Sequence, residues 1–224
     1  MRTQGWIIAI DGPSGAGKTT AARNLARRLG YTYLDTGATF RAIAVKALRS
    51  KIDTEEPAAV VEIARRAELR FGGAEHERLL LDGEDVTVAI RTVEIAKLAS
   101  KISAYPELRK VLTQLWRQLA REGGMVLEGR DIGTVVFPDA DVKFYLVARP
   151  EVRAERRYRE NPAGGQSLEQ VASEMARRDE ADSTRRHAPL TRAPDAIEVD
   201  TSVLDIEATT DKLERFVRAR MRED

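Results

Sequence analysis

Cysteine is absent from the 224-residue chain, and histidine occurs only twice. The lack of cysteine excludes disulfides and thiolate metal sites, and it fits a reducing cytoplasm. His76 and His187 are isolated in the sequence, so we expect loop or surface positions rather than a zinc site. No apolar run approaches the roughly 20 residues that span a bilayer, and no signal peptide precedes Trp6. We therefore expect a cytoplasmic protein that binds no membrane.

Net charge is also nearly absent, since 37 basic and 36 acidic residues leave a formal charge of +1. This balance argues against a nucleic-acid partner or a general membrane-surface binder. The basic residues are mostly arginine, and they cluster at 149–159 and 177–192. A planar guanidinium binds phosphate oxygens in pairs, which an ammonium cannot do. The composition therefore favours small anionic substrates, and the length fits one domain with a small insertion or lid.

Glycine is concentrated at one place near the amino terminus. Residues 12–20, Gly-Pro-Ser-Gly-Ala-Gly-Lys-Thr-Thr, fit the pattern G-x-x-x-x-G-K-[ST]. An apolar run at 6–11 predicts a buried strand before them, and the pattern at 21–30 predicts a helix after them. This context indicates a phosphate-binding loop rather than a chance turn. Lys18 would reach the β- and γ-phosphates of a nucleotide, and the Thr19 hydroxyl would ligate Mg²⁺.

The rest of the chain alternates strand and helix patterns, which predicts a mainly parallel sheet. We expect strands at 31–35, 125–128, 142–147 and 196–200, and helices at 38–50, 54–68, 91–103, 106–122, 149–160, 167–186 and 203–220. Thr36-Gly37 is expected to form a turn, and Thr54 to cap a helix. Short strand candidates at 69–71, 78–82 and 85–88, separated by glycine turns, predict a small antiparallel sheet.

A phosphate loop alone is compatible with kinases, GTPases and ATPases. The guanine-reading tetrapeptide Asn-Lys-x-Asp is missing, which argues against a GTPase. Gly164-Gly165-Gln166 matches the ABC-type ATPase signature only in part and lies in a short charged segment. Glu128 ends an apolar run that resembles a Walker-B strand, and Arg130-Asp131 follows it directly. Parallel sheets place ligands at such strand ends, so we expect Arg130 and Asp131 to belong to a binding site.

Peptides along nearly the whole chain resemble those of the nucleoside monophosphate kinases, and among them the bacterial cytidylate kinases. The matching peptides are Ile-Asp-Gly-Pro-Ser-Gly-Ala-Gly-Lys from Ile10, Leu-Asp-Thr-Gly-Ala from Leu34, Glu-Asp-Val from Glu84, Ile-Arg-Thr from Ile90, Gly-Arg-Asp-Ile-Gly-Thr-Val-Val-Phe-Pro-Asp-Ala from Gly129 and Ala-Pro-Leu from Ala188. The resemblance implies an α/β phosphate-loop fold with an adenylate-kinase-like five-stranded parallel sheet flanked by helices. A small antiparallel insertion and a short helical lid complete it.

The same resemblance implies a single kinase domain, 1–224, divided into three regions. These are a core at about 1–37, 104–148 and 190–224, a monophosphate-binding region with the small β insertion at about 38–103, and a lid with its following helix at about 149–189. Three positions depart from the family pattern: Thr20 stands where relatives have other small residues, Thr36 where many have serine, and Glu128 where aspartate is commoner. The role of Glu128 is left open by this difference.

Site residues can be carried over from the family one by one. The residues implied to hold the ATP phosphates are Gly12, Pro13, Ser14, Gly15, Ala16, Gly17, Lys18, Thr19 and Thr20. Those implied to bind CMP are Thr36, Arg41, Ser100, Arg109, Arg130, Asp131, Arg178, Asp182 and Arg185. The implied catalytic set is Lys18, Arg130, Asp131 and the lid arginines Arg153, Arg156 and Arg157. Within the CMP set, Ser100, Arg109 and Asp131 would read cytosine.

Several of these residues have a simpler interpretation. Helical spacing also allows the lid arginines to pair with Glu151, Glu155 and Glu160 on a solvated helix face. Arg178, Asp182 and Arg185 have the spacing of a surface ion-pair ladder. Ser100 can equally terminate or cap a helix.

The implied reaction is ATP + (d)CMP → ADP + (d)CDP, with Mg²⁺, by direct in-line transfer in a monomer. A carboxylate at Asp131 can accept from the cytosine 4-amino group, whereas uracil offers a carbonyl there and is rejected. Closure of segment 149–165 is expected to exclude water from the transfer. The alternatives are a kinase of the same fold for UMP, AMP or shikimate, and a non-catalytic ATP-binding switch.

Overall fold

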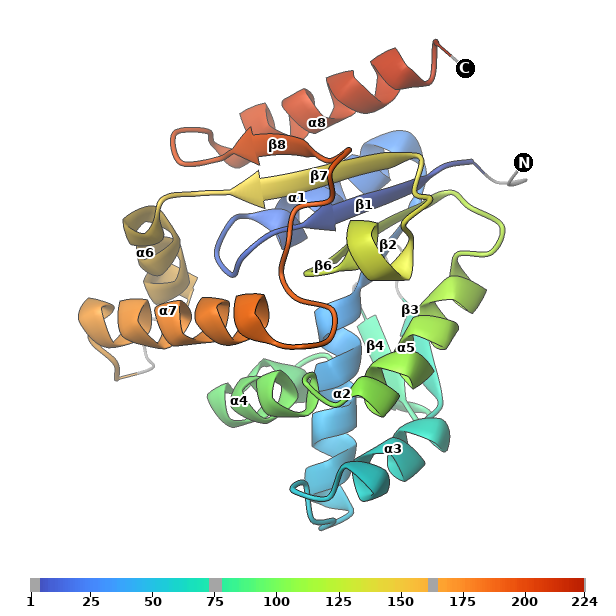
Figure 1. The fold of residues 1–224 in the computed structure, drawn as a ribbon, viewed down its shortest axis with the longest axis vertical. Helices are drawn as coiled ribbons and strands as arrows, with labels where there is room; N and C mark the ends of the chain where they lie inside the picture. Colours follow the sequence, from blue (N-terminus) through green and yellow to red (C-terminus); the bar gives the residue numbers. More distant parts are fainter. Residues whose placement is uncertain (1–4, 73–77, 161–164, 224) are drawn as a thin grey trace.

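The chain forms a five-stranded parallel sheet, seen in a computed structural model that describes residues 5–72, 78–160 and 165–223. The strands are β1 (Ile7–Asp11), β2 (Thr32–Asp35), β6 (Met125–Gly129), β7 (Val142–Val147) and β8 (Ile197–Asp200). Their order is β2-β6-β1-β7-β8. The predicted parallel sheet and all five of its strands are confirmed. β1 lies in the centre, so the loop that follows it leaves the middle of the sheet (Figure 1).

Side chains of β1 alternate between two buried layers, as the pleat of a strand requires. Ile7 and Ala9 pack with α2 (Thr36–Arg49), α3 (Pro57–Arg65), α4 (Val93–Ile102) and α5 (Pro106–Leu119). Ile8 and Ile10 pack with α1 (Lys18–Leu29) and α8 (Ile206–Arg220) on the opposite face. The central strand is therefore buried on both sides, and only its carboxyl end is free to serve a site.

A second, smaller sheet lies beside α2, on the same side of the parallel sheet as that helix (Figure 1). Its antiparallel strands are β3 (Leu69–Gly72), β4 (Arg78–Leu81) and β5 (Glu84–Asp85), in that order. The predicted insertion is thus confirmed, but its third strand is only two residues long. Val86 is buried directly after it, and the chain turns into the short helix η1 (Ala89–Arg91). Gly73, predicted in the turn before β4, lies outside the described residues.

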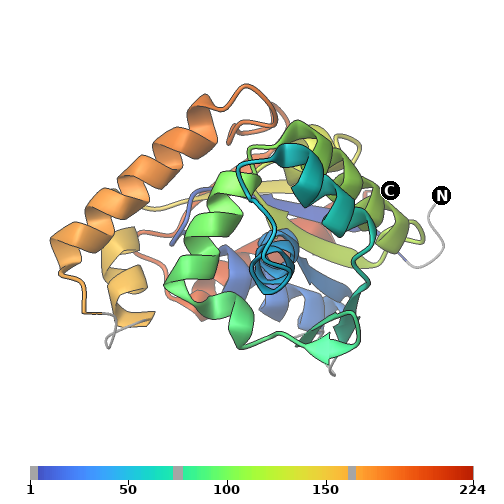
Figure 2. The ribbon, with the colours of Figure 1, turned by 90° about the horizontal axis from the view of Figure 1, so that it is seen from below.

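Helices α6 (Pro150–Glu160) and α7 (Leu168–Thr184) form an arm at one end of the sheet, as both views show (Figures 1 and 2). Ala154 of α6 packs against Val171 and Met175 of α7 in a small apolar cluster of their own. Ser167 and Gln170 form a capping box that starts α7. Both helices agree with the predicted segments. Asn161 to Gly164, between them, lie outside the described residues.

Two local predictions are wrong, both at the start of a helix. Thr36-Gly37 is not a turn, since the Asp35 carboxylate accepts from the Ala38 N–H at 2.9 Å and starts α2 at Thr36. Thr54 does not cap α3, which begins at Pro57. Ile132–Val136, which the sequence pattern assigned to no helix or strand, winds into one π-helical turn, η2. Among the described residues, no helix combines the length and apolar character needed to cross a bilayer.

Candidate active site

The phosphate loop occupies residues 12–17, between the carboxyl end of β1 and the first turn of α1. At Gly12, with φ 143°, a Cβ would lie 2.1 Å from the Leu146 carbonyl oxygen, so the backbone of β7 leaves room for glycine alone. Gly17 precedes α1, whose positive end points into the loop. The predicted strand–loop–helix context is therefore confirmed.

Lys18 is buried at the start of α1, and its Nζ donates to the Pro13 carbonyl oxygen at 2.7 Å. Burial and the nearby Arg130 guanidinium lower the pKa of Lys18 to about 7, although Glu128 and Asp11 act in the opposite direction. A desolvated ammonium beside another cation gains strongly from an added anion. Lys18 is thus prepared electrostatically for a phosphate group.

Thr19, exposed at the loop, is within hydrogen-bonding reach of Glu128 at the end of β6. Glu128 is buried, and it accepts from the Tyr33 hydroxyl at 2.5 Å through Oε1. Burial and the neighbouring Asp35 raise the pKa of Glu128. A hydroxyl and carboxylates are the oxygen donors that Mg²⁺ prefers. The described residues contain no group of three or more histidine, aspartate or glutamate side chains arranged to hold a metal.

A second cluster of charges lies where β6 ends and Arg130-Asp131 begins. Arg109 of α5 donates from Nη2 to Asp131 Oδ1 at 2.5 Å, and both side chains are almost completely buried. The guanidinium of Arg109 also lies 5.3 Å from the centre of the Phe40 ring, a cation–π contact that fixes its plane. Asp131 Oδ2 is buried and has no hydrogen-bond partner among the described residues. Such an acceptor indicates a ligand that donates to it.

Helix α7 adds further charges to this cluster. Arg130 donates from Nε to Asp182 Oδ2 at 2.9 Å. Arg185 lies 3.5 Å from Asp182 Oδ1 through Nη1 and 3.8 Å from Asp131 Oδ1 through Nη2. These side chains are buried, with 9% of both Asp182 and Arg185 exposed. The surface ion-pair ladder considered for α7 is therefore excluded for this pair.

Positive charge exceeds negative charge in this buried cluster. Burial and the nearby Arg130 lower the pKa of Arg178 to about 10, and its Nε has no hydrogen-bond partner among the described residues. Burial and Arg109 likewise lower the pKa of Arg185 to about 10. Several guanidiniums are thus buried close together, an arrangement suited to an anion such as a phosphate group.

The remaining predicted acceptor residues surround these clusters. Arg41 of α2 pairs with Asp35 at 2.7 Å, and the Thr36 hydroxyl donates to the Glu128 carbonyl oxygen at 2.7 Å. Ser100 of α4 lines a cavity of about 450 Å³ together with Ser14 and Arg178. This cavity extends from the phosphate loop to α4 and α7, and Arg178 is the member of the second cluster that lines it.

The lid arginines of α6 differ in what they contact. Arg153 is buried and donates to the Ser14 carbonyl oxygen at 3.1 Å and to Asp179 of α7. Arg156 donates to the Thr201 carbonyl oxygen at 2.6 Å and to its hydroxyl at 3.0 Å. Neither follows the solvated-face alternative.

Arg157 donates to Glu160 at 2.9 Å, as that alternative proposes, and it also lines the cavity. The lid contacts the phosphate loop where the Arg153 side chain donates to the Ser14 carbonyl oxygen.

Sequence reasoning missed Asp11, Asp179 and Thr201. Asp11 was available as a carboxylate directly before the loop, and it accepts from two backbone amides after Asp131. Thr201 follows β8 and donates to the carbonyl oxygens of Ala16 and Val147, both at 3.1 Å, so it fastens the loop to the sheet. No local pattern signals a residue whose partners are 26 or more positions away.

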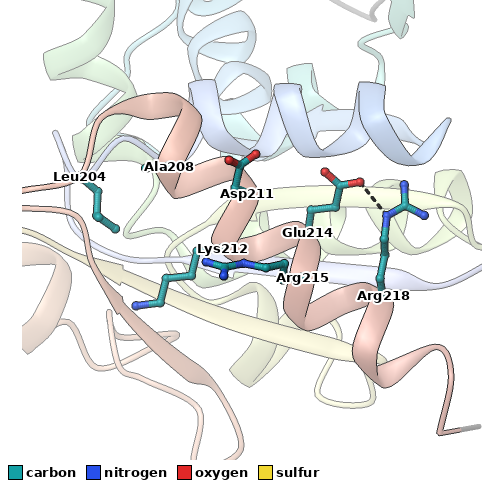
Figure 3. Close-up of a pocket in the computed structure, with 7 residues that line it drawn as sticks. All are labelled: Leu204, Ala208, Asp211, Lys212, Glu214, Arg215 and Arg218. Atoms are coloured by element: carbon teal, nitrogen blue, oxygen red, sulfur yellow. Dashed lines mark hydrogen bonds and ion pairs between the residues drawn. The ribbon is translucent and has the colours of Figure 1, made fainter.

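A second hollow, of about 570 Å³, lies along α8 (Figure 3). Its lining consists of Leu204, Ala208, Asp211, Lys212, Glu214, Arg215 and Arg218. Asp211 and Glu214 point toward α1, where both bind Arg28. None of the predicted site residues lines this hollow, so it is separate from the two clusters described above.

Fold and site together define a class, the phosphate-loop kinases, in which one loop binds the donor phosphates and a second pocket receives the acceptor. Comparison with known proteins specifies the family. A family model described as cytidylate kinase matches residues 8–219, and the chain belongs to the cytidylate kinase family. This confirms the resemblance noted in the sequence.

Curated relatives match over nearly the whole chain. Cytidylate kinase of Geobacter sulfurreducens is 52% identical, with 98% of this chain and 95% of that protein covered. Cytidylate kinase of Carboxydothermus hydrogenoformans is 47% identical, with 92% and 94% covered. Among solved structures, an uncharacterized protein from Eubacterium ventriosum shares 11% identity and a TM-score of 0.54, covering 96% of this chain and 99% of that one. The last similarity supports the fold alone.

Proposed function

We propose that this protein transfers the γ-phosphoryl group of ATP to CMP, and also to dCMP, forming ADP and the nucleoside diphosphate. The observation that carries the proposal is the buried Arg109–Asp131 pair at the end of β6, in a chain of the cytidylate kinase family. Its free carboxylate oxygen matches the 4-amino group of cytosine. Uracil presents a carbonyl oxygen at that position, and two facing acceptors repel each other.

ATP would bind with its phosphates in the loop formed by residues 12–20, where backbone amides and Lys18 supply positive charge. Arg41, Arg130 and Arg185 would bind the CMP phosphate, and Arg178 and Asp182 the ribose. The excess of guanidinium charge around these positions supports this division. Positioned charge of this kind is the main requirement of phosphoryl transfer, which needs no covalent intermediate on the protein.

Mg²⁺ would be held by the Thr19 hydroxyl together with ATP phosphates and water, and Glu128 lies close enough to bind one of those waters. When bound, the ion would neutralise charge between the β- and γ-phosphates. Thr36 would line the acceptor pocket near the end of β6, where its hydroxyl donates to the Glu128 carbonyl oxygen.

Lid closure by residues of segment 149–165 would exclude water, with Arg153, Arg156 and Arg157 moving relative to the phosphate loop. We propose that residues 38–103 form the monophosphate-binding region, 149–189 the lid with its helix, and the rest the core. Because both clusters come from one chain, the protein would act as a monomer. Its location would be the cytoplasm, and its partners would be nucleotides, with no nucleic acid or membrane.

ADP release with CMP, dCMP, UMP and AMP as acceptors, each with ATP and Mg²⁺, tests the proposed reaction. We expect rapid release with CMP and dCMP, slower release with UMP, and release near background with AMP. Chelation of Mg²⁺ should stop transfer, and added Mg²⁺ should restore it. Preference for AMP, or ADP release that ignores the acceptor, would contradict the assignment while leaving the phosphate loop intact.

Two substitutions separate donor from acceptor functions. Arg109→Met removes the partner of Asp131 and should lower kcat/KM for CMP by about tenfold to a hundredfold, with a smaller loss for UMP. Lys18→Ala should abolish transfer to every acceptor, because the loop loses its cation. Steady-state kinetics with both acceptors provide the measurement. Equal losses for CMP and UMP in Arg109→Met would remove Arg109 from base recognition.

A further inference from the structure

Asp11 lies between the two charge clusters. It is the last residue of β1, directly before the phosphate loop, and only 4% of it is exposed. Its Oδ1 accepts from the Ile132 N–H at 2.8 Å, and its Oδ2 accepts from the Gly133 N–H at 2.7 Å. These two amides begin η2, the turn that directly follows Asp131. One carboxylate thus joins the end of the donor strand to the turn that bears the base-reading residue.

The turn also packs against β7. A Cβ on Gly133 would lie 3.1 Å from Cδ of Lys143, so glycine allows close contact here. Lys143 is itself buried on β7, and its Nζ donates to the Pro138 carbonyl oxygen at 2.6 Å and pairs with Asp195 at 2.8 Å. The start of η2 therefore contacts two buried charged side chains, Asp11 and Lys143. Two charge-assisted bonds from Asp11 fix both the distance and the direction of its amides.

Asp11 is held there against an electrostatic cost. Burial is the main influence that raises its pKa to about 6, and the nearby Asp131 carboxylate adds to it. The amides of Gly133 and Ile132, and then Lys18, act in the opposite direction. The two amide bonds are therefore what compensates a buried carboxylate beside a second one. Their loss would allow Asp11 and Asp131 to move apart.

We propose that Asp11 is a positioning residue for base recognition, acting through the backbone of η2 on the carboxylate of Asp131. Asp131 is one peptide bond from the anchored Ile132 amide, and its contact with Arg109 is only 2.5 Å long. A small shift of the turn therefore changes how Asp131 faces a base, whereas the donor loop keeps its own contacts. Misplacement of a recognition group by a fraction of an ångström costs rate and specificity. The inference rests on the proposed cytidylate kinase activity.

The test compares Asp11→Asn with the matched control Asp141→Asn. Asparagine keeps the shape of Asp11 but places an NH₂ donor against a backbone N–H, so one of the two bonds is lost. Asp141 accepts from the Ile7 N–H at 2.7 Å, at the other end of the same strand. We expect the ratio of kcat/KM for CMP to that for UMP to fall about tenfold in Asp11→Asn, whereas the loss of a charge near Lys18 should lower both values alike. Asp141→Asn should keep the wild-type ratio.

A measurement on the wild-type protein covers the case in which Asp11→Asn does not fold. Trans-hydrogen-bond couplings in NMR should join the Asp11 carboxyl carbon to the amide nitrogens of Ile132 and Gly133. A wild-type ratio in a folded Asp11→Asn, an equal fall in Asp141→Asn, or missing couplings would overturn the inference. Failure of the wild type to phosphorylate CMP would instead overturn the proposed function, and the couplings would still be measurable.

Discussion

Burial of the Lys18 ammonium destabilises the folded protein relative to an apolar side chain at the same position. Its ammonium is buried beside Arg130, and this environment brings its pKa to about 7 from an ordinary value of 10.5. Arg178 and Arg185 show the same pattern on the acceptor side, with their pKa values lowered by burial. Each cation is stabilised by an anion added nearby. The free protein is therefore destabilised where nucleotides would bind, a common relation between activity and stability.

Lys18→Met should stabilise the nucleotide-free protein while abolishing transfer. The folded-state pKa of Lys18 lies below its unfolded value, so the unfolded chain binds the additional proton between about pH 7 and pH 10.5. The contribution of Lys18 to the free energy of unfolding therefore rises with pH across this window. Methionine removes the penalty, which is a few kcal/mol at pH 7. Denaturant unfolding at pH 7 and pH 9 should show a stabilisation that shrinks at the higher pH.

The control is the same lysine-to-methionine change at a position outside the phosphate loop. Lys46→Met removes a lysine that pairs with Asp82 on the surface of α2, away from the phosphate loop. Its effect on unfolding should be small and nearly independent of pH between 7 and 9. A Lys18→Met protein no more stable than the wild type at pH 7 would contradict the electrostatic cost assigned to the buried ammonium.

Helix α6 meets the phosphate loop through packing as tight as that in a protein core. At Gly15, which has φ 75°, a Cβ would lie 2.9 Å from both the Arg153 carbonyl oxygen and Met175 Cε. The adjacent carbonyl of Ser14 accepts from Arg153. The lid therefore rests directly on the loop, and a single added carbon at Gly15 would separate them.

Gly15→Ala should lower kcat by about tenfold or more, because the lid could no longer approach the loop. Gly30→Ala is the matched control, since Gly30 has a similar φ of 67° and no atom within 4 Å of an added Cβ. Both variants bear the strain of a left-handed alanine, about 1 kcal/mol, in the free energy of unfolding. Only Gly15→Ala should also lose activity, as measured by ADP release with CMP. Equal kcat losses in the two variants would mean that backbone strain, not lid contact, is responsible.

Ion pairs join α1, near the amino terminus, to α8, near the carboxyl terminus, on the sheet face opposite α2. Arg28 of α1 donates to Asp211 at 2.6 Å and to Glu214 at 2.9 Å, and it also pairs with Glu207. All three acceptors lie on α8, which packs with α1 over β1 and β7 (Figures 1 and 3). This clasp is far from the acceptor cluster, which lies on the other side of the sheet. It should therefore affect stability and not transfer.

Arg28→Gln should lower Tm by a few degrees at low ionic strength, because three carboxylates lose their common partner. The difference should shrink in 1 M salt, since exposed ion pairs are screened. Scanning calorimetry at both salt concentrations measures it, with Arg218→Gln, which pairs with Glu214 alone on the same helix, as the control. Loss of kcat/KM for CMP in Arg28→Gln would contradict the separation of the clasp from the site.

Prediction from the sequence succeeded where a feature is encoded by neighbouring residues. The strand, loop and helix around Lys18 could be predicted because apolar spacing and glycine placement report directly on local backbone conformation. The start of α2 at Thr36 was missed, although Asp35 stands in the correct position to cap it. A cap competes with a turn for the same residues, and the pattern does not decide between them. The π-helical turn at Ile132–Val136 has no known local signature.

By itself, the sequence determined the phosphate loop, the alternation of strands and helices, and the family whose peptides recur along the chain. The tertiary structure alone decided which charges meet: Arg109 with Asp131, Arg130 with Asp182, and Asp11 with the amides of η2. The reason is physical, because local conformation depends on near neighbours, whereas these pairs join residues 22, 52 and 121 positions apart. Only the folded sheet brings such residues to one edge, where they are buried together.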